Sequence, residues 1–130
     1  MVLGGQKSEH YFQAQKFPGT PHVEEIRQVK TPTYAAKMGR DRSLPLRPDW
    51  EQVKDDIMRQ AVLRKFETHA DIREVLLDTA DALLVEKSPT DYYWGCGADG
   101  SGKNRLGAIL MEVREILRDR TNTVLPVITS

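Results

Sequence analysis

The sequence predicts one mainly helical α+β domain with a small β component. Apolar residues recur three and four apart after Asp49 and again after Asn104, as they do on one face of a helix. A short apolar run of β type, ALLVE at residues 82–86, is the candidate strand. The 130 residues are about the length of one domain, so we expect a single domain over 1–130 that ends in a tail at 121–130.

The first part of the chain reads as short helices separated by proline and glycine. Ser8 is expected to cap a helix over residues 9–17, which a Phe-Pro-Gly sequence then ends. Two shorter helices are expected at 22–29 and 33–40, each introduced by a proline. Residues 41–49 contain two further prolines and read as an irregular connection.

The second part of the chain is predicted to carry the main apolar faces. Asp49 and Gln52 have capping-box spacing, and they precede a helix whose apolar stripe is Trp50, Val53, Ile57, Met58, Ala61 and Val62. Another helix is expected at 70–80. The last helix begins near Asn104, and its stripe is Leu106, Ile109, Leu110, Val113 and Leu117. We expect these two stripes to pack into one core, with residues 121–130 as a tail or a short edge strand.

Charge and composition exclude several classes of protein. Lys plus Arg and Asp plus Glu both number 19, so no net charge is available to hold nucleic acid or an anionic membrane. The single cysteine excludes an intrachain disulfide and indicates a reducing compartment. No apolar run approaches the roughly 18 residues of a membrane span, and the first residues lack the pattern of a signal peptide. We expect a cytoplasmic protein.

The segment GADGSGKN at residues 97–104 is one residue short of a phosphate-binding P-loop. Asn104 stands where the P-loop requires a Ser or Thr hydroxyl to bind magnesium. The polar and aromatic insert KSPTDYYW separates the loop from the candidate strand, and too little sequence follows to build a parallel sheet. The P-loop interpretation therefore fails. The glycines still permit close approach of a ligand, and free amides at a helix start favour an anion.

Three groups of residues are candidates for a site. Glu9, Gln13 and Lys16 are spaced four and three apart, and this spacing alone favours a solvated helix face over a functional site. Arg40, Arg42 and Arg47 could clamp a phosphate. Surface charge is the simpler interpretation of each arginine, and a core position is the simpler interpretation of Trp50.

The third group is the run Tyr92, Tyr93 and Trp94, followed by four glycines within eight residues. The aromatic rings could stack on a flat heterocycle or fill the core, and both interpretations remain open. The three histidines share no short spacing, so no metal site is predicted. Cys96 has no neighbouring base that would make it a nucleophile.

Three segments, SEHYFQAQKF, MGRDRSLPLRPDW and YWGCGADGSGKNRLG, together resemble the YbiA-like, or NADAR, family of N-glycosidases. The resemblance runs from about Ser8 to Arg120. It implies a compact, mainly helical α+β domain that cleaves C–N glycosidic bonds. Members act on ribosylamino-pyrimidine phosphates of riboflavin biosynthesis, and relatives remove ADP-ribose from guanine. The family loop carries asparagine at the position of Asn104, so its likeness to a P-loop is accidental.

The resemblance implies roles for particular residues. Glu9 and Lys16 are the expected catalytic residues. The expected substrate-binding residues are Gln13, Arg40, Trp50, Trp94, Gly95, Gly102, Asn104 and Gly107, and Gly39 also matches the middle motif. Cys96 departs from the family, because many bacterial members carry an acidic residue there. Family members also have an aromatic-rich segment before the first motif, so we expect another segment or subunit to complete the site.

The expected reaction is hydrolysis of the C–N bond between ribose phosphate and an amino-pyrimidine or amino-pyrimidinone. Glu9 would stabilise the cation that develops at the anomeric carbon, or activate water, and a neutral Lys16 could capture the opened sugar as a Schiff base. Trp94 would stack on the base, with Asn104 and glycine amides on the ribose or phosphate. No metal or organic cofactor is required. The alternatives are an ADP-ribosyl-guanine hydrolase, a non-catalytic ADP-ribose or nucleotide-binding module, and an inert fragment.

Overall fold

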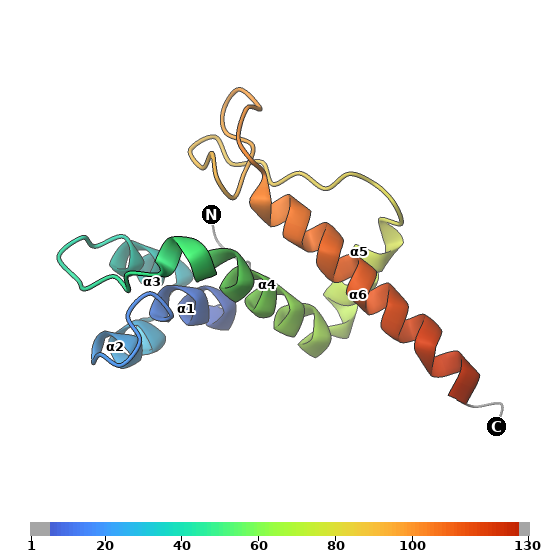
Figure 1. Ribbon diagram of the computed structural model, residues 1–130, viewed down its shortest axis with the longest axis horizontal. Coiled ribbons are helices and arrows are strands. Elements are labelled where there is room, and N and C mark those ends of the chain that lie inside the picture. Colours follow the sequence, from blue (N-terminus) through green and yellow to red (C-terminus); the bar gives the residue numbers. More distant parts are fainter. Residues whose placement is uncertain (1–5, 128–130) are drawn as a thin grey trace. The chain divides into compact units, whose positions relative to one another are not determined.

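The computed structural model describes residues 6–127, and the surroundings of the side chains from 8 to 120. It is helical, with no strand within residues 6–127 (Figure 1). The helices are α1 (Gln6–Ala14), α2 (His22–Gln28), α3 (Pro32–Gly39), α4 (Trp50–Thr68), α5 (Ala70–Asp78) and α6 (Arg105–Val127). The chain divides into two compact units, a first unit that ends at Lys65 and a second unit that starts at Phe66, and each is described by itself. None of the helices in the described part is both long and apolar enough to cross a membrane.

In the first unit, α1, α2 and α3 pack against one another around a small apolar core. Its buried residues are Ala14, Phe17, Ile26 and Ala35, and Val23, Val29, Met38 and Leu44 cover them. Local signals set the boundaries of α3, because Thr31 accepts a hydrogen bond from the Tyr34 amide and Pro32 occupies the first turn. The helices predicted at 22–29 and 33–40 are thus confirmed.

The first helix differs from its prediction at both ends. α1 already includes Ser8, so Ser8 is not its cap, and α1 stops at Ala14 instead of Phe17. The amides of Lys16 and Phe17 donate to carbonyls only three residues back, which makes a tight turn. Pro18 explains the early end, because a proline disfavours helical geometry at the residue before it. Lys16 consequently lies in the turn after the helix.

The long helix α4 begins where the sequence predicts, but without the capping box. The Asp49 carboxylate accepts two hydrogen bonds from the Arg47 guanidinium, at 2.6 and 2.9 Å, and the Gln52 amide instead donates to the Asp49 carbonyl. A bidentate pair with a charged guanidinium outcompetes a single neutral amide. The predicted apolar face is confirmed, because Trp50, Ile57, Met58, Ala61 and Val62 are buried.

In the second unit, α5 packs beside α6. The buried Arg114 of α6 donates to Thr79 Oγ1 and to the Ala82 carbonyl, at 2.8 and 2.9 Å, and so ties α6 to the segment that follows α5. The predicted stripe of α6 is buried at Leu106, Ile109, Val113 and Leu117, and half-buried at Leu110. Packing of this stripe on the face of α4 concerns both units and stays a prediction.

The predicted tail is wrong over residues 121–127, because α6 continues to Val127. A glycine after the last turn commonly ends a helix, but no glycine follows Gly107 in the sequence. The helix therefore has no glycine stop signal near residue 120. Residues 128–130 lie outside the described part of the chain.

The strand predicted at 82–86 does not form. In its place, the Asn104 side chain pairs with an irregular segment: its Nδ2 donates to the Leu84 carbonyl at 3.0 Å, and its Oδ1 accepts from the Glu86 amide at 2.9 Å. The Cys96 amide donates to the Glu86 carbonyl at 3.0 Å. A strand needs a neighbouring backbone, and here a single side chain and one loop amide take that place. The small β component is therefore absent from residues 6–127.

Candidate active site

The two residues of the predicted polar stripe that lie on α1, Glu9 and Gln13, are buried, which rejects the solvated-face interpretation. Glu9 has no exposed surface, and Gln13 is 5% exposed. Gln13 Nε2 donates to Glu9 Oε1 at 2.7 Å. α2 and α3 cover α1, and the buried His10 links α1 to the end of α2 through a 2.7 Å hydrogen bond between its Nε2 and the Val29 carbonyl. A carboxylate held in the interior of a small unit is costly, so its retention indicates a role.

Lys16 lies beside this carboxylate, among aromatic rings. Its Nζ donates to the Gly39 carbonyl at 3.1 Å and lies 5.5 Å from the ring centroid of Trp50 and 6.0 Å from that of Phe12. Phe12 and Trp50 pack edge to face with centroids 5.3 Å apart. Trp50 is therefore a core residue, as its sequence position suggested, and also a wall beside the lysine amine.

The surroundings of Lys16 make its amine easier to deprotonate than a lysine in water. Burial is the largest cause that lowers the pKa of Lys16 to about 8, from 10.5. The negative charge of Glu9 opposes this effect, and the positive charges of Arg40 and Lys54 add to it. At a pKa of about 8, roughly one molecule in four carries an uncharged amine at about pH 7.5. An uncharged amine is the form that a nucleophilic lysine requires, and a nucleophilic role for Lys16 stays a prediction.

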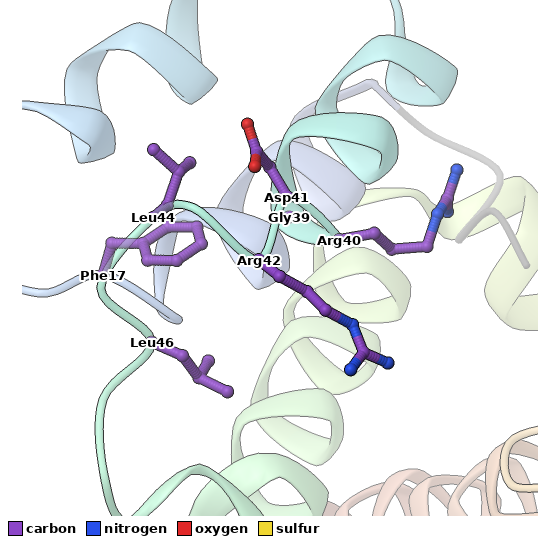
Figure 2. A pocket seen from close by; sticks show the side chains of 7 residues that line it. All are labelled: Phe17, Gly39, Arg40, Asp41, Arg42, Leu44 and Leu46. Atoms are coloured by element: carbon purple, nitrogen blue, oxygen red, sulfur yellow. The ribbon is translucent and has the colours of Figure 1, made fainter.

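A pocket of about 540 Å³ adjoins Gly39 at the end of α3, lined by Phe17, Gly39, Arg40, Asp41, Arg42, Leu44 and Leu46 (Figure 2). The guanidinium groups of Arg40 and Arg42 are exposed and have no ion pair or hydrogen bond to another described residue. The Asp41 carboxylate points away from both in Figure 2. It accepts hydrogen bonds from Ser43, which hold the pKa of Asp41 below its ordinary value. Two positive groups at a pocket suit an anion.

The glycine-rich loop of the second unit binds its own helix. The carbonyls of Gly95, Tyr93 and Trp94 accept hydrogen bonds from the amides of Asn104, Arg105 and Leu106, at 3.1, 2.9 and 3.0 Å. These are the amides that open α6. The expectation of free amides for an anion is therefore wrong at these positions, because the loop folds back and caps the helix itself.

The loop glycines make room for neighbouring parts of the same loop. A Cβ on Gly102 would overlap the Gly95 carbonyl, and one on Gly107 would overlap the Leu84 carbonyl and the Asn104 amide. Asn104 has φ 52°, a left-handed conformation that asparagine tolerates far better than most residues. This geometry and its two side-chain hydrogen bonds explain asparagine at this position. Substrate binding by Gly95, Gly102, Asn104 and Gly107 stays a prediction.

The aromatic run does not fill a core. Tyr92 is 46% exposed, and Tyr93 and Trp94 are half-buried. Asp91 Oδ1 accepts from the amides of Tyr93 and Trp94, at 3.0 and 2.7 Å, and the two rings lie edge to face with centroids 4.8 Å apart. The Trp94 ring is therefore held in place while keeping an exposed part, as a stacking platform requires.

The structure gathers the predicted residues into two groups. Glu9, Gln13, Lys16, Gly39, Arg40 and Trp50 come together in the first unit, and Trp94, Gly95, Gly102, Asn104 and Gly107 in the second. Convergence of the two groups on one site stays a prediction. Sequence reasoning missed Phe12 as a wall of the lysine site. Its spacing of four residues from Lys16 was the available signal.

Comparison with known proteins identifies the class. The NADAR domain matches residues 6–118, and the chain belongs to this family. It is 60% identical to the N-glycosidase YbiA of Escherichia coli over 110 residues, which are 85% of this chain and 69% of that protein. It is 57% identical to an N-glycosidase of Nostoc punctiforme, over 85% of this chain and 73% of the relative.

Two further comparisons support this assignment. The chain is 45% identical to the riboflavin biosynthesis protein PYRR of Zea mays, over 84% of this chain and 19% of that protein. The NMR structure of the Escherichia coli protein YbiA matches with a TM-score of 0.82 and 58% identity, over 88% of this chain and 68% of that structure. The mainly helical architecture is thus shared with a solved member of the family.

Proposed function

We propose that this chain is an N-glycosidase that hydrolyses the C–N bond between ribose phosphate and an amino-pyrimidine or amino-pyrimidinone. One observation carries the proposal: Lys16, whose pKa is lowered to about 8, is placed beside the buried Glu9 carboxylate. Relatives named as N-glycosidases and as riboflavin biosynthesis proteins support the reaction class and the substrate. The substrate is a small molecule, and the proposed location is the cytoplasm.

Lys16 performs the bond cleavage through a Schiff base. In the opened form of the substrate, C1 of the ribose is double-bonded to the amino nitrogen of the base. The neutral Lys16 amine adds to C1, the base nitrogen takes a proton and leaves as a free amine, and C1 is left double-bonded to Nζ. Water then adds to C1 and the bond to Nζ breaks, which releases ribose phosphate as its aldehyde and regenerates the lysine. The complete reaction consumes only water.

Glu9 assists this chemistry through its charge. Because the carboxylate has no exposed surface, direct activation of a water molecule is disfavoured. In an interior of low dielectric its negative charge stabilises the positive charge that develops at C1 and on the iminium nitrogen. Lys16, which is only half-buried, is the group that the substrate reaches.

Arg40 and Arg42 bind the substrate phosphate in this proposal. Neither guanidinium has an ion pair or hydrogen bond to another described residue, and their pocket shares Gly39 with the Lys16 site, whereas the amides that open α6 are already occupied. Trp94 stacks on the base, and the loop glycines and Asn104 hold the loop in shape. A further segment or another subunit completes the wall of the site, and we propose that it supplies the small β component of the family fold.

Loss of Arg42 should weaken binding of the phosphate selectively. Arg42→Ala should raise KM for the phosphorylated substrate about tenfold with little change in kcat, because a charge-assisted hydrogen bond is lost in the ground state and transition state alike. The same substrate without its phosphate should show no difference. Arg47→Ala is the matched control, since Asp49 already holds that guanidinium. An unchanged KM for the phosphorylated substrate would reject the phosphate site.

Two substrates test the proposed reaction. The chain is incubated with a ribosylaminouracil phosphate and, separately, with an ADP-ribosylated guanine oligonucleotide, and the released base is quantified by chromatography. We expect release of the aminouracil. Cleavage of the oligonucleotide alone would favour the ADP-ribosyl-guanine hydrolase. Binding of either ligand by calorimetry without cleavage would leave a non-catalytic binding module.

A further inference from the structure

The buried amide of Gln13 has one hydrogen bond too few. Its Nε2 donates to Glu9 Oε1 at 2.7 Å, while its Oε1 is buried without a partner among the described residues. Exchanging the two ends of the amide would set an oxygen against the Glu9 carboxylate, so the observed orientation is the favourable one. An orphaned buried carbonyl destabilises the folded chain, so its presence indicates that the group serves another purpose.

Gly39 gives the Gln13 amide its space. A Cβ at Gly39 would overlap Gln13 Oε1 and lie 2.6 Å from its Cδ. Gly39 is the last residue of α3, and it is not among the glycines of positive φ, so its backbone does not require glycine. The carbonyl of the same residue accepts the hydrogen bond from Lys16 Nζ. One glycine therefore serves both the lysine and the glutamine.

We propose that Gln13 is a positioning residue, which holds the Glu9 carboxylate in place beside Lys16, and that Gly39 is glycine because a side chain there would displace Gln13. This inference rests on the proposed function and deepens it, because it assigns Gln13 to the catalytic carboxylate instead of to the substrate. It also explains why α3 carries glycine at position 39, although alanine has the higher helix propensity.

Two different substitutions disrupt the hydrogen bond between Gln13 and Glu9. Gln13→Met keeps the length of the side chain but removes the donor to Glu9 and the orphaned acceptor. Gly39→Ala leaves Gln13 chemically intact but forces its flexible end away from Glu9. Each should lower kcat about tenfold with little change in KM, because a charge-assisted hydrogen bond that orients the catalytic carboxylate is lost. Gln15→Met, two residues away and half-buried, is the matched control.

The pH dependence separates positioning from a general loss of structure. The charged groups that act on Lys16 are Glu9 on α1, Arg40 after α3 and Lys54 on α4, and only Glu9 raises the lysine pKa. Displacing Glu9 should therefore move the pKa of Lys16 to lower pH. NMR of the lysine side-chain carbons, with the Lys16 signal assigned by its absence in Lys16→Met, measures this shift without substrate. This measurement uses no substrate, so it tests the position of Glu9 even if the proposed function is wrong.

A double mutant gives the decisive comparison. Gly39→Ala should lower kcat in the native background but cause no further loss in the Gln13→Ala background, where the overlapping amide is gone. Additive losses would overturn the link between Gly39 and Gln13. An unchanged pKa of Lys16 in both Gln13→Met and Gly39→Ala, with both variants folded by circular dichroism, would overturn the positioning role itself.

Discussion

Replacing Glu9 by Gln should lower kcat by about a hundredfold or more and leave KM nearly unchanged. Glutamine has the same size, and its carbonyl can still accept the hydrogen bond from Gln13 Nε2. The substitution removes the negative charge, and in a buried environment that charge stabilises the developing cation far more than it would in water. The measurement is a steady-state comparison on the ribosylaminouracil phosphate.

The control for this variant is Glu24→Gln. Glu24 is exposed on α2 and pairs with Arg27, so removal of its charge should leave turnover unchanged. Glu9→Gln should also move the alkaline ionisation of Lys16 to lower pH, because the charge of Glu9 raises the pKa of that lysine. A kcat within a few-fold of the native value would rule out the electrostatic role of Glu9.

Removal of the Lys16 amine should have the larger effect. Lys16→Ala should reduce turnover by about a thousandfold or more, since the nucleophile is lost. Lys16→Met should be equally inactive although it keeps most of the stem that packs near Phe12 and Trp50, which separates loss of the amine from loss of packing. Lys30→Ala, at an exposed position, should retain activity.

Borohydride gives direct evidence for the intermediate. Added during turnover, it should reduce the imine between C1 and Nζ and leave the sugar phosphate attached to Lys16, where peptide mass spectrometry locates it. The rate of the chemical step should rise from pH 7 to 9 with an apparent pKa near 8, because the neutral amine attacks. Turnover without trapping in the native chain, or trapping at a residue other than Lys16, would reject the Schiff base at Lys16.

The lowered pKa of Lys16 also affects stability. Between about pH 8 and 10.5 the unfolded chain holds the Lys16 proton while the folded chain has lost it, so the free energy of unfolding should rise with pH in this window. Lys16→Met lacks this contribution, and the stability difference between the two chains by urea titration should change in the same window.

The sequence by itself determined most of the helices and the family motifs. Apolar spacing and prolines located α2, α3, α4 and α5 closely, because those signals act within a few residues of the chain. Local reasoning was wrong where competing interactions decide. Arg47 takes the Asp49 carboxylate from its expected capping role, and the Asn104 side chain occupies the place of a strand partner for residues 82–86.

Only the tertiary structure decided which of these residues form a site. The spacing of Glu9, Gln13 and Lys16 places them on one side of the first helix but contains no information on what covers them, so it favoured a solvated face. α2 and α3 pack on α1, where Glu9 and Gln13 are buried, and α3 brings Gly39 against Gln13. The start of α4 places Trp50 beside Lys16. The physical reason is that the pKa of a lysine and the effect of a carboxylate depend on dielectric and neighbouring charge, which residues distant in sequence supply.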